Sequence, residues 1–256
     1  MRGEISAPVS LVFGFLLVLA RVGGLFIFIP LSGVRNVAAP VRVILILAIT
    51  MALYPLWPVV TSEPSLLDYI GWIVTEAAFG LGIGILVGVL SESMILFGQT
   101  IGLQAGYSFA STIDPNTQAD STVLSTMAES IGSLLFISLG LHHYVIRIFA
   151  ASLESHPPGK LMISARWSDP VIHATAGIFS TGLRLALPVI ALLMMVDLTL
   201  AMLGRINSQL QLLSLSFPLK MLSALAILTA VLTLLPTLYE SLARGVLGVA
   251  VKFTRQ

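Results

Sequence analysis

The chain has 256 residues, of which 57% are hydrophobic and only 10% are charged, and its net charge is +1. A soluble domain carries about a quarter charged residues, so this composition excludes that class and predicts an integral membrane protein. The small net charge excludes an electrostatic surface for nucleic acid. The absence of cysteine excludes disulfides, thiolate metal sites and cysteine nucleophiles.

A membrane-spanning helix needs about 20 mostly apolar residues. Six stretches meet this requirement: 9–31, 41–60, 70–90, 123–151, 171–203 and 221–250. The first is interpreted as a retained transmembrane helix, because no convincing small-residue cleavage site follows it. The stretch 94–113 is rich in Gly, Gln and Ser, and could be a seventh helix, a re-entrant arm or a broken segment. The sequence thus predicts one all-helical, polytopic membrane domain.

The basic residues of the loops predict the orientation of the chain. Loop 32–40, followed by Arg42, and loop 204–220 fall on one side if six helices span the membrane, and their Lys/Arg excess places that side in the cytoplasm. If the stretch 94–113 crosses the membrane completely, every later loop lies on the opposite side of the membrane. Loop 204–220 carries Arg205, Gln209 and Lys220, and is interpreted either as a cytoplasmic docking or gating loop or as an ordinary connector. Pro218 is expected to start the last helix.

Glycines recur every four residues in two consecutive segments. The first set follows Glu76 and precedes Glu92, each by four residues, and the second lies in the stretch 98–106. Small residues at this spacing allow helix backbones to approach closely in a membrane. The helices could pack against each other within the chain or against other subunits, and two successive ladders favour other subunits. The glycines are Gly80, Gly84 and Gly88, then Gly98, Gly102 and Gly106.

Five charged residues lie inside otherwise apolar segments: Arg21, Glu76, Glu129, Arg184 and Asp197. A charge at the bilayer centre costs at least about 2.5–3.5 kcal/mol, so these residues are predicted to be buried beside a partner or in a water-filled cavity. Their mixed signs favour structural pairing over a proton relay or transport pathway. Alternatively, part of the helical mass sits above the bilayer and is shielded by partner subunits.

No enzymatic or metal-binding motif is present. Of the four histidines, His142 and His143 are adjacent and point about 100° apart on a helix, which makes a poor chelating pair. Metalloprotease, phosphate-loop and nucleophile-elbow patterns are absent. The sequence therefore predicts a protein that is not an enzyme and holds no metal or cofactor.

Several motifs in order resemble one known family. They are Arg21-Val-Gly-Gly leading to Pro30, Gly102-x-Gln104-x-Gly106, Asp114-Pro115 and Gly204-Arg205…Phe217-Pro218-Leu219-Lys220. Over nearly the whole chain they resemble FliR, the T-type subunits of the type III secretion export gate. The resemblance implies a fusion of a P-type part (about 1–170, with a plug loop at 106–122) and a Q-type hairpin (about 171–256). Its helical hairpins would be inverted and largely lifted out of the bilayer plane.

The resemblance also implies partners and a role. Such subunits assemble with FliP and FliQ in the bacterial inner membrane, within the flagellar basal body and among membrane lipid, and FlhB and FlhA act with them. The gate passes unfolded flagellar proteins. A plug in the closed pore would correspond to a segment flanked by Gly106 and by Asp114-Pro115, namely Phe109, Ala110, Ser111, Thr112 and Ile113.

Three alternatives remain open. One is the homologous gate subunit of a virulence injectisome, against which the run Phe217-Pro218-Leu219-Lys220 favours the flagellar branch. Another is a secondary transporter of a small solute that uses Glu76, Arg184 and Asp197. The usual internal repeat of such transporters is not found in the sequence. The third is a purely structural assembly subunit that does not line a pore.

Overall fold

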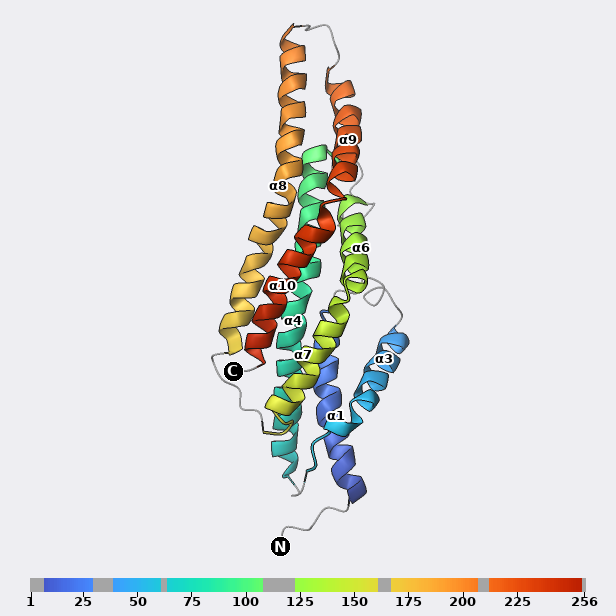
Figure 1. Cartoon of the computed structure of the whole chain (residues 1–256), viewed down its shortest axis with the longest axis vertical. Coiled ribbons are helices and arrows are strands. Elements are labelled where there is room, and N and C mark those ends of the chain that lie inside the picture. The colour runs from blue at the N-terminus through green and yellow to red at the C-terminus, as the bar shows by residue number, and fades with distance from the viewer. Residues whose placement is uncertain are drawn as a thin grey trace. The chain divides into compact units, whose positions relative to one another are not determined.

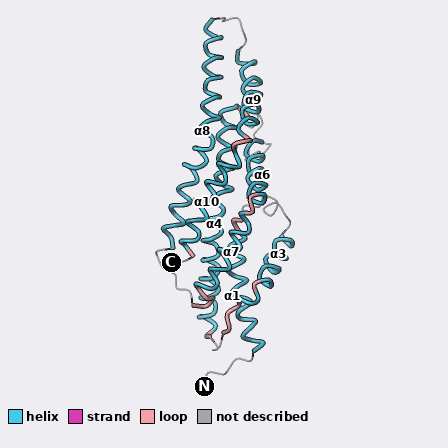
Figure 2. The backbone as a smooth tube through the Cα atoms, viewed as in Figure 1, coloured by secondary structure: helices cyan, strands magenta, loops and turns pink. Residues whose placement is uncertain are grey.

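A computed structural model describes residues 7–29, 39–60, 64–107, 123–160, 167–206 and 212–254, and within these ranges all regular structure is helical (Figure 2). The predicted fold class, a polytopic all-helical membrane protein, is confirmed. Eight α-helices and one short 3₁₀ helix are described (Figure 1): α1 (Ala7–Phe26), α3 (Ala39–Ala52), η1 (Tyr54–Leu56), α4 (Leu66–Ala105), α6 (Val123–Ser138), α7 (Leu141–Ser155), α8 (Ser168–Ile206), α9 (Leu212–Val231) and α10 (Leu235–Phe253).

Three of the described helices, α1, α4 and α8, are long and apolar enough to cross a membrane, and there are up to five spans if each bent pair counts as one. The predicted separation of 70–90 from 94–113 is wrong, because α4 is a single helix of 40 residues. At 1.5 Å per residue it is about 60 Å long. This is twice the roughly 30 Å thickness of the hydrocarbon core, so α4 is longer than an upright crossing requires.

Two predicted spans are bent rather than straight. The helices α6 and α7 meet at 68°, and so do α9 and α10. Between α6 and α7 lies Gly140 with φ 68°, a left-handed conformation that glycine adopts readily and that ends a helix. The predicted span 41–60 is also shorter than expected. Its helix α3 ends at Ala52, close before Tyr54-Pro55, because a residue that precedes proline disfavours the helical conformation.

The described helices form two compact units, each built from separate parts of the chain. Unit 1 comprises the described residues of Met1–Val89, Phe136–Ala176 and Ala243–Gln256. Its core is apolar, with the buried side chains Leu17, Val18, Val22, Phe79, Ile83, Leu86, Phe149 and Phe253. Hydrophobic burial of this kind is the main stabilising contribution to unit 1.

Unit 2 comprises the described residues of Leu90–Leu135 and Gly177–Leu242. Its buried side chains are Met94, Phe97, Ile101, Leu124, Leu185, Val189, Leu193 and Tyr239. The units therefore interleave along the sequence, and α4 contributes residues to both. The predicted P-type and Q-type parts, which would divide the chain near residue 170, stay a prediction.

Candidate functional site

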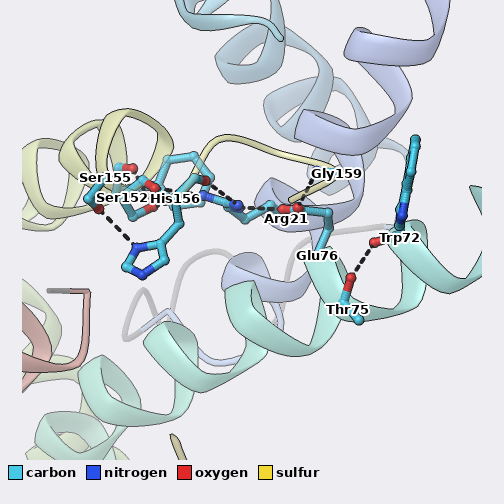
Figure 3. Close-up of polar contacts among 9 residues, drawn as sticks. Arg21, Trp72, Thr75, Glu76, Ser152, Ser155, His156 and Gly159 are labelled. Atoms are coloured by element: carbon cyan, nitrogen blue, oxygen red, sulfur yellow. Dashed lines mark hydrogen bonds and ion pairs between the residues drawn. The ribbon is translucent and has the colours of Figure 1, made fainter. Parts of the chain in front are cut away.

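Arg21 of α1 and Glu76 of α4 form a fully buried ion pair in unit 1 (Figure 3). The Nε of Arg21 donates to Oε2 of Glu76 over 2.6 Å, and both side chains are 0% exposed. A charge transferred from water into a protein interior is stable only if it is paired and hydrogen-bonded. The pair therefore explains how two of the five predicted charges are accommodated inside apolar helices.

The remaining polar groups of this pair bind the end of α7. The two terminal nitrogens of Arg21 donate to the carbonyl oxygens of Ser152 and His156, each over 2.9 Å. The free end of a helix leaves carbonyls unpaired and carries partial negative charge, so a cation is favoured there. Oε1 of Glu76 accepts the backbone N–H of Gly159 over 2.9 Å. We call these contacts the Arg21 network; it joins α1, α4 and α7.

Aromatic rings cover the Arg21 network. The guanidinium carbon of Arg21 lies 5.0 Å from the ring centre of Phe79, a cation–π distance. Phe79 also stacks on Phe253 and meets Trp167 edge-on, with ring centres 5.1 and 5.0 Å apart. Burial, and then the nearby Arg21 charge, lower the pKa of His156 below its ordinary value. The ion pair itself is thus shielded from water, and the partly buried His156 favours a neutral imidazole.

The first glycine ladder packs α4 against α1. A Cβ on Gly84 would lie 2.6 Å from the carbonyl oxygen of Leu25, and one on Gly88 would lie 2.9 Å from that of Phe28. A Cβ on Gly80 would overlap the backbone of Arg21 itself. The three glycines therefore pack against the same chain, so the favoured prediction that they face other subunits is wrong for this ladder. The close approach positions Arg21 for Glu76.

In unit 2, Gly98 of the second ladder packs α4 against α6, and Gly106 ends α4. The predicted close packing of Gly102 stays a prediction. A Cβ on Gly98 would lie 2.5 Å from the carbonyl oxygen of Leu124. Gly106 has φ 86°, and the N–H of Tyr107 binds the carbonyl of Gly102 over 2.9 Å. This is the bonding pattern of a Schellman helix end, which requires a residue such as glycine in the left-handed region.

A second group of polar side chains lies where α4 ends. Asp197 of α8 accepts from Nζ of Lys220 at 2.8 Å and from Nε2 of Gln104 at 3.0 Å. The Lys220 and Asp197 side chains are 19% and 38% exposed. Beside them, the hydroxyl of Tyr107 donates to the carbonyl of Met221 over 3.4 Å. We call these contacts the Asp197 cluster; it joins the end of α4 to α8 and α9.

The chain is similar to known bacterial export proteins over most of its length. Residues 12–246 match the family described as "Bacterial export proteins, family 1". The chain belongs to this family. Flagellar biosynthetic protein FliR of Escherichia coli (strain K12) is 28% identical over 88% of this chain and 86% of the relative. FliR of Caulobacter vibrioides is 30% identical over 83% of this chain and 85% of the relative. FliR of Bacillus subtilis (strain 168) is 27% identical over 80% of this chain and 81% of the relative. The resemblance seen in the motifs is confirmed.

Several residues predicted from the export-protein resemblance lie outside the described residues. These are the whole predicted plug with its C-terminal flank, Phe109–Ile113 and Asp114-Pro115, and also Gln209. Gly106, the N-terminal flank, is described and lies at the end of α4. The structure therefore describes the end of α4 that precedes the segment 108–122, but not the segment itself.

The remaining predicted charges differ in burial. Glu129 is half-buried in α6, Arg184 is exposed on α8, and Arg205 is exposed near the end of α8. The prediction that Arg184 is buried is wrong for the described chain, because its side chain points away from the packed face formed by Leu185 and Val189. Likewise, Asp197 is only partly buried.

The predicted loop 204–220 is mostly helical. The helix α8 extends to Ile206 and α9 begins at Leu212, so Lys220 and Pro218 lie within α9 and not in a loop or at a helix start. The apolar residues that precede Pro218 extend α9 toward its N-terminus. Lys220 therefore pairs with Asp197 rather than contributing to a cytoplasmic loop.

Some residues of the two sites were not predicted. Ser152 accepts from Arg21 with its carbonyl and, over 3.4 Å, with its hydroxyl oxygen, and His156 accepts with its carbonyl. Any residue type carries a carbonyl, so no sequence signal could identify these carbonyl contacts. Gly159 donates a backbone N–H and has a left-handed φ of 84°. Its place after two prolines indicates a turn, but not which side chain its N–H will bind. Gln104 was noted within a motif, and its polar side chain in an apolar helix was the available signal.

Proposed function

We propose that this chain is the FliR-type subunit of a flagellar export gate, which passes unfolded flagellar proteins across the bacterial inner membrane. The observation that carries the proposal is the family match over residues 12–246, together with relatives that bear the name FliR. All three are flagellar by name, which favours the flagellar branch over an injectisome. The role requires no bond-making chemistry, so we propose that the chain is not an enzyme.

The geometry of unit 2 supports a gating role for the segment 108–122. The segment leaves α4 at Tyr107, which is bonded to α9, and enters α6 at Val123. Because Gly98 packs on Leu124, the helices at its two ends lie in close contact. A segment held at both ends in this way can close a passage without the two helices separating. Its Phe109–Ile113 part would form the seal, since small and apolar side chains exclude ions and offer a passing polypeptide no strong binding site.

Exposed apolar surface supports assembly with other membrane subunits, which we propose are FliP and FliQ, with FlhB and FlhA acting on the gate. Only 28% of the most apolar window of α8 is buried, against 61% for α4. The exposed side chains of α8 include Phe179, Met195, Leu198 and Met202. Exposed apolar side chains in such number mark a helix that contacts protein or lipid.

A cross-linking experiment tests the proposal. Because the natural chain has no cysteine, Phe109→Cys introduces a single reactive thiol. Expressed in a flagellated bacterium that lacks its own FliR, the variant should restore motility and form a cross-link to a stalled export substrate. A matched thiol at Phe179, exposed on α8, should react with neighbouring subunits and not with the substrate.

Two results would contradict the proposal. Failure of the natural chain to join the flagellar complex in any host tested, together with solute uptake by the purified chain alone, would favour the transporter. Cross-linking of the substrate to Phe179→Cys but not to Phe109→Cys would favour a scaffold that does not line the pore.

A further inference from the structure

The helix α8 carries two charged side chains away from its ends, Arg184 and Asp197. Asp197 pairs with Lys220 of α9, whereas the Arg184 side chain has no hydrogen bond or ion pair in the described part of the chain. Arg184 stands near the middle of the 39 residues of a helix that is long and apolar enough to cross a membrane. A charge inside such a helix is costly when it is unpaired, so Arg184 requires a partner that the described chain does not supply.

The backbone beside Arg184 also lacks its regular partner. In an α-helix the carbonyl of Arg184 would accept the N–H of the residue four positions later, which here is Pro188 and has no N–H. Within a bilayer such a freed carbonyl is satisfied by neighbouring helices, hydroxyl side chains or ordered water. Because Pro188 is itself exposed, the carbonyl that faces it lies at the outer side of α8. A donor and an acceptor that both require partners therefore stand together.

Mostly small residues surround Arg184 on the outer side of α8. Ser180, Arg184, Leu187 and Ala191 are exposed and are spaced by four, three and four residues, so they form one face of the helix, the Arg184 face. Gly177 extends this face by three residues, and no atom lies within 4 Å of a Cβ placed on it. The buried residues of α8 in this region are Gly182, Leu185, Ala186, Val189 and Leu193. Small residues allow a second helix to approach α8 closely.

The two polar groups specify the chemistry of the partner. A guanidinium presents its N–H donors in a planar fork that matches the two oxygens of a carboxylate. A backbone carbonyl accepts from a hydroxyl or an amide. The complementary surface is therefore a helix that carries Asp or Glu within an apolar stretch, with a hydroxyl or amide side chain about one turn away.

A second copy of this chain is a poor source of that carboxylate. Among the described residues, Glu76 and Asp197 are already paired with cations of the same chain. Glu92 and Glu129, the other acidic residues well inside α4 and α6, also have interactions within the chain. The charge balance therefore favours a different subunit as the partner.

We propose that the Arg184 face is the docking surface for a membrane helix of a different subunit, whose carboxylate pairs with Arg184. A hydroxyl or amide of the same helix donates to the carbonyl that Pro188 leaves free. This inference rests on the proposed function, in which the chain is one of several membrane subunits, and it adds the place and the chemistry of one contact.

Co-purification tests the docking surface. The tagged full-length chain is co-expressed with FliP and FliQ of the same organism, and the amount of each subunit retained in mild detergent is measured. Arg184→Glu should lower the retained amount of one subunit at least about tenfold, because it places two like charges at the interface. The control Lys252→Glu makes the same change of charge in the last turn of α10 and should retain both subunits.

A second pair of variants tests the close approach. Gly177→Leu adds a side chain to the Arg184 face, where the chain leaves open space, and should lower retention of the same subunit. The control Gly71→Leu adds the same side chain at an equally open position of α4 and should retain both subunits. The two changes leave the packing of the chain itself intact, so a difference between them reports the interface.

Cross-linking and a charge exchange identify the partner group. A photoreactive benzoylphenylalanine in place of Leu187, which is 51% exposed, should cross-link to the subunit that Arg184→Glu releases. Mass spectrometry should place the cross-link in an apolar segment that contains Asp or Glu. Replacement of that acid by Arg should restore retention by the Arg184→Glu chain.

Each contrary outcome has a definite meaning. If the natural chain retains neither subunit, the proposed function fails and this inference fails with it. If the natural chain retains both, and Arg184→Glu and Gly177→Leu retain them equally well, only this inference is overturned. A cross-link from residue 187 to phospholipid, or to a second copy of the chain, also overturns it. If Arg184→Glu fails to fold, the Gly177→Leu pair and the cross-link decide the question.

Discussion

The two ion pairs of this chain differ in what surrounds them. Arg21 and Glu76 are 0% exposed, and the Arg21 network reaches backbone groups near the end of α7. Lys220 and Asp197 are 19% and 38% exposed, and in the described part of the chain Gln104 also donates to this carboxylate. A buried pair cannot open without leaving charges in an apolar interior, whereas water can replace the contacts of an exposed pair. The first pair is therefore suited to a permanent junction and the second to a reversible one.

The largest expected effect comes from breaking the buried pair. Glu76→Leu leaves the Arg21 guanidinium buried without its counter-ion, which typically costs about 3–5 kcal/mol. Thermal unfolding in detergent should show a loss of this order. The double variant Arg21→Met/Glu76→Leu should recover most of it, because no charge is then buried alone. A double variant as unstable as the single one would show that the geometry of the network, not its charge, is what matters.

The next effect tests the helix contact that positions the buried pair. Gly84→Leu forces bulk against the backbone of Leu25, and overpacking of this kind costs about 1–3 kcal/mol. Protease resistance of the purified chain measures the loss. The control is Gly71→Leu in the same helix, since no atom lies within 4 Å of a Cβ at Gly71. Equal loss in the two variants would contradict close packing as the cause.

Breaking the exposed pair should change stability little and local opening more. Lys220→Gln should cost about 1 kcal/mol or less, because solvent screens a partly exposed pair. A loss of about 1 kcal/mol raises the population of a locally open state up to about fivefold. A thiol introduced by Phe109→Cys should therefore react with maleimide up to about fivefold faster. The exposed Lys252→Gln serves as the control and should leave the rate unchanged. An unchanged rate in Lys220→Gln would mean that the Asp197 cluster does not restrain the segment that follows Gly106.

The smallest effect is a pH dependence of unit 1 through His156. Burial and the Arg21 charge hold its pKa below the ordinary value of 6.5 in the folded chain, although Glu76 and the Thr254 backbone act in the opposite direction. The unfolded chain therefore binds a proton first as the pH falls through 6.5, and stability decreases below that pH. Above pH 6.5 both states are neutral and the residue has no effect. His156→Gln should flatten this part of the pH–stability curve, and a curve of unchanged slope would contradict the assignment.

Sequence patterns predicted the features that depend on local spacing. The low charge content and long apolar stretches indicated a helical membrane protein, because a bilayer accepts little else. The four-residue spacing of Gly80, Gly84 and Gly88 indicated a close-packed face, since that spacing keeps side chains on one side of a helix. The isolated charges indicated pairing, and Arg21 with Glu76 provides it.

Other features could not be predicted, because they depend on residues far apart in the chain. Arg21 and Glu76 are 55 positions apart, and Arg21 and His156 are 135 apart. The spacing of apolar residues in the sequence does not show which backbone carbonyls an arginine side chain will bind. In the sequence, α6 and α7 look like one long apolar span. The bend at Gly140 depends on its left-handed backbone conformation, which does not change the hydropathy of the neighbouring residues.

The sequence by itself determined that this protein is a helical membrane chain with close-packed glycine faces, paired charges and export-protein motifs. Tertiary structure alone decided that the first glycine face packs on α1, that Lys220 reaches Asp197 from within α9, and that a cavity lies between α3 and α7. The reason is physical. Hydropathy and spacing act within one helix, whereas partners and cavities arise only where helices from distant parts of the chain meet.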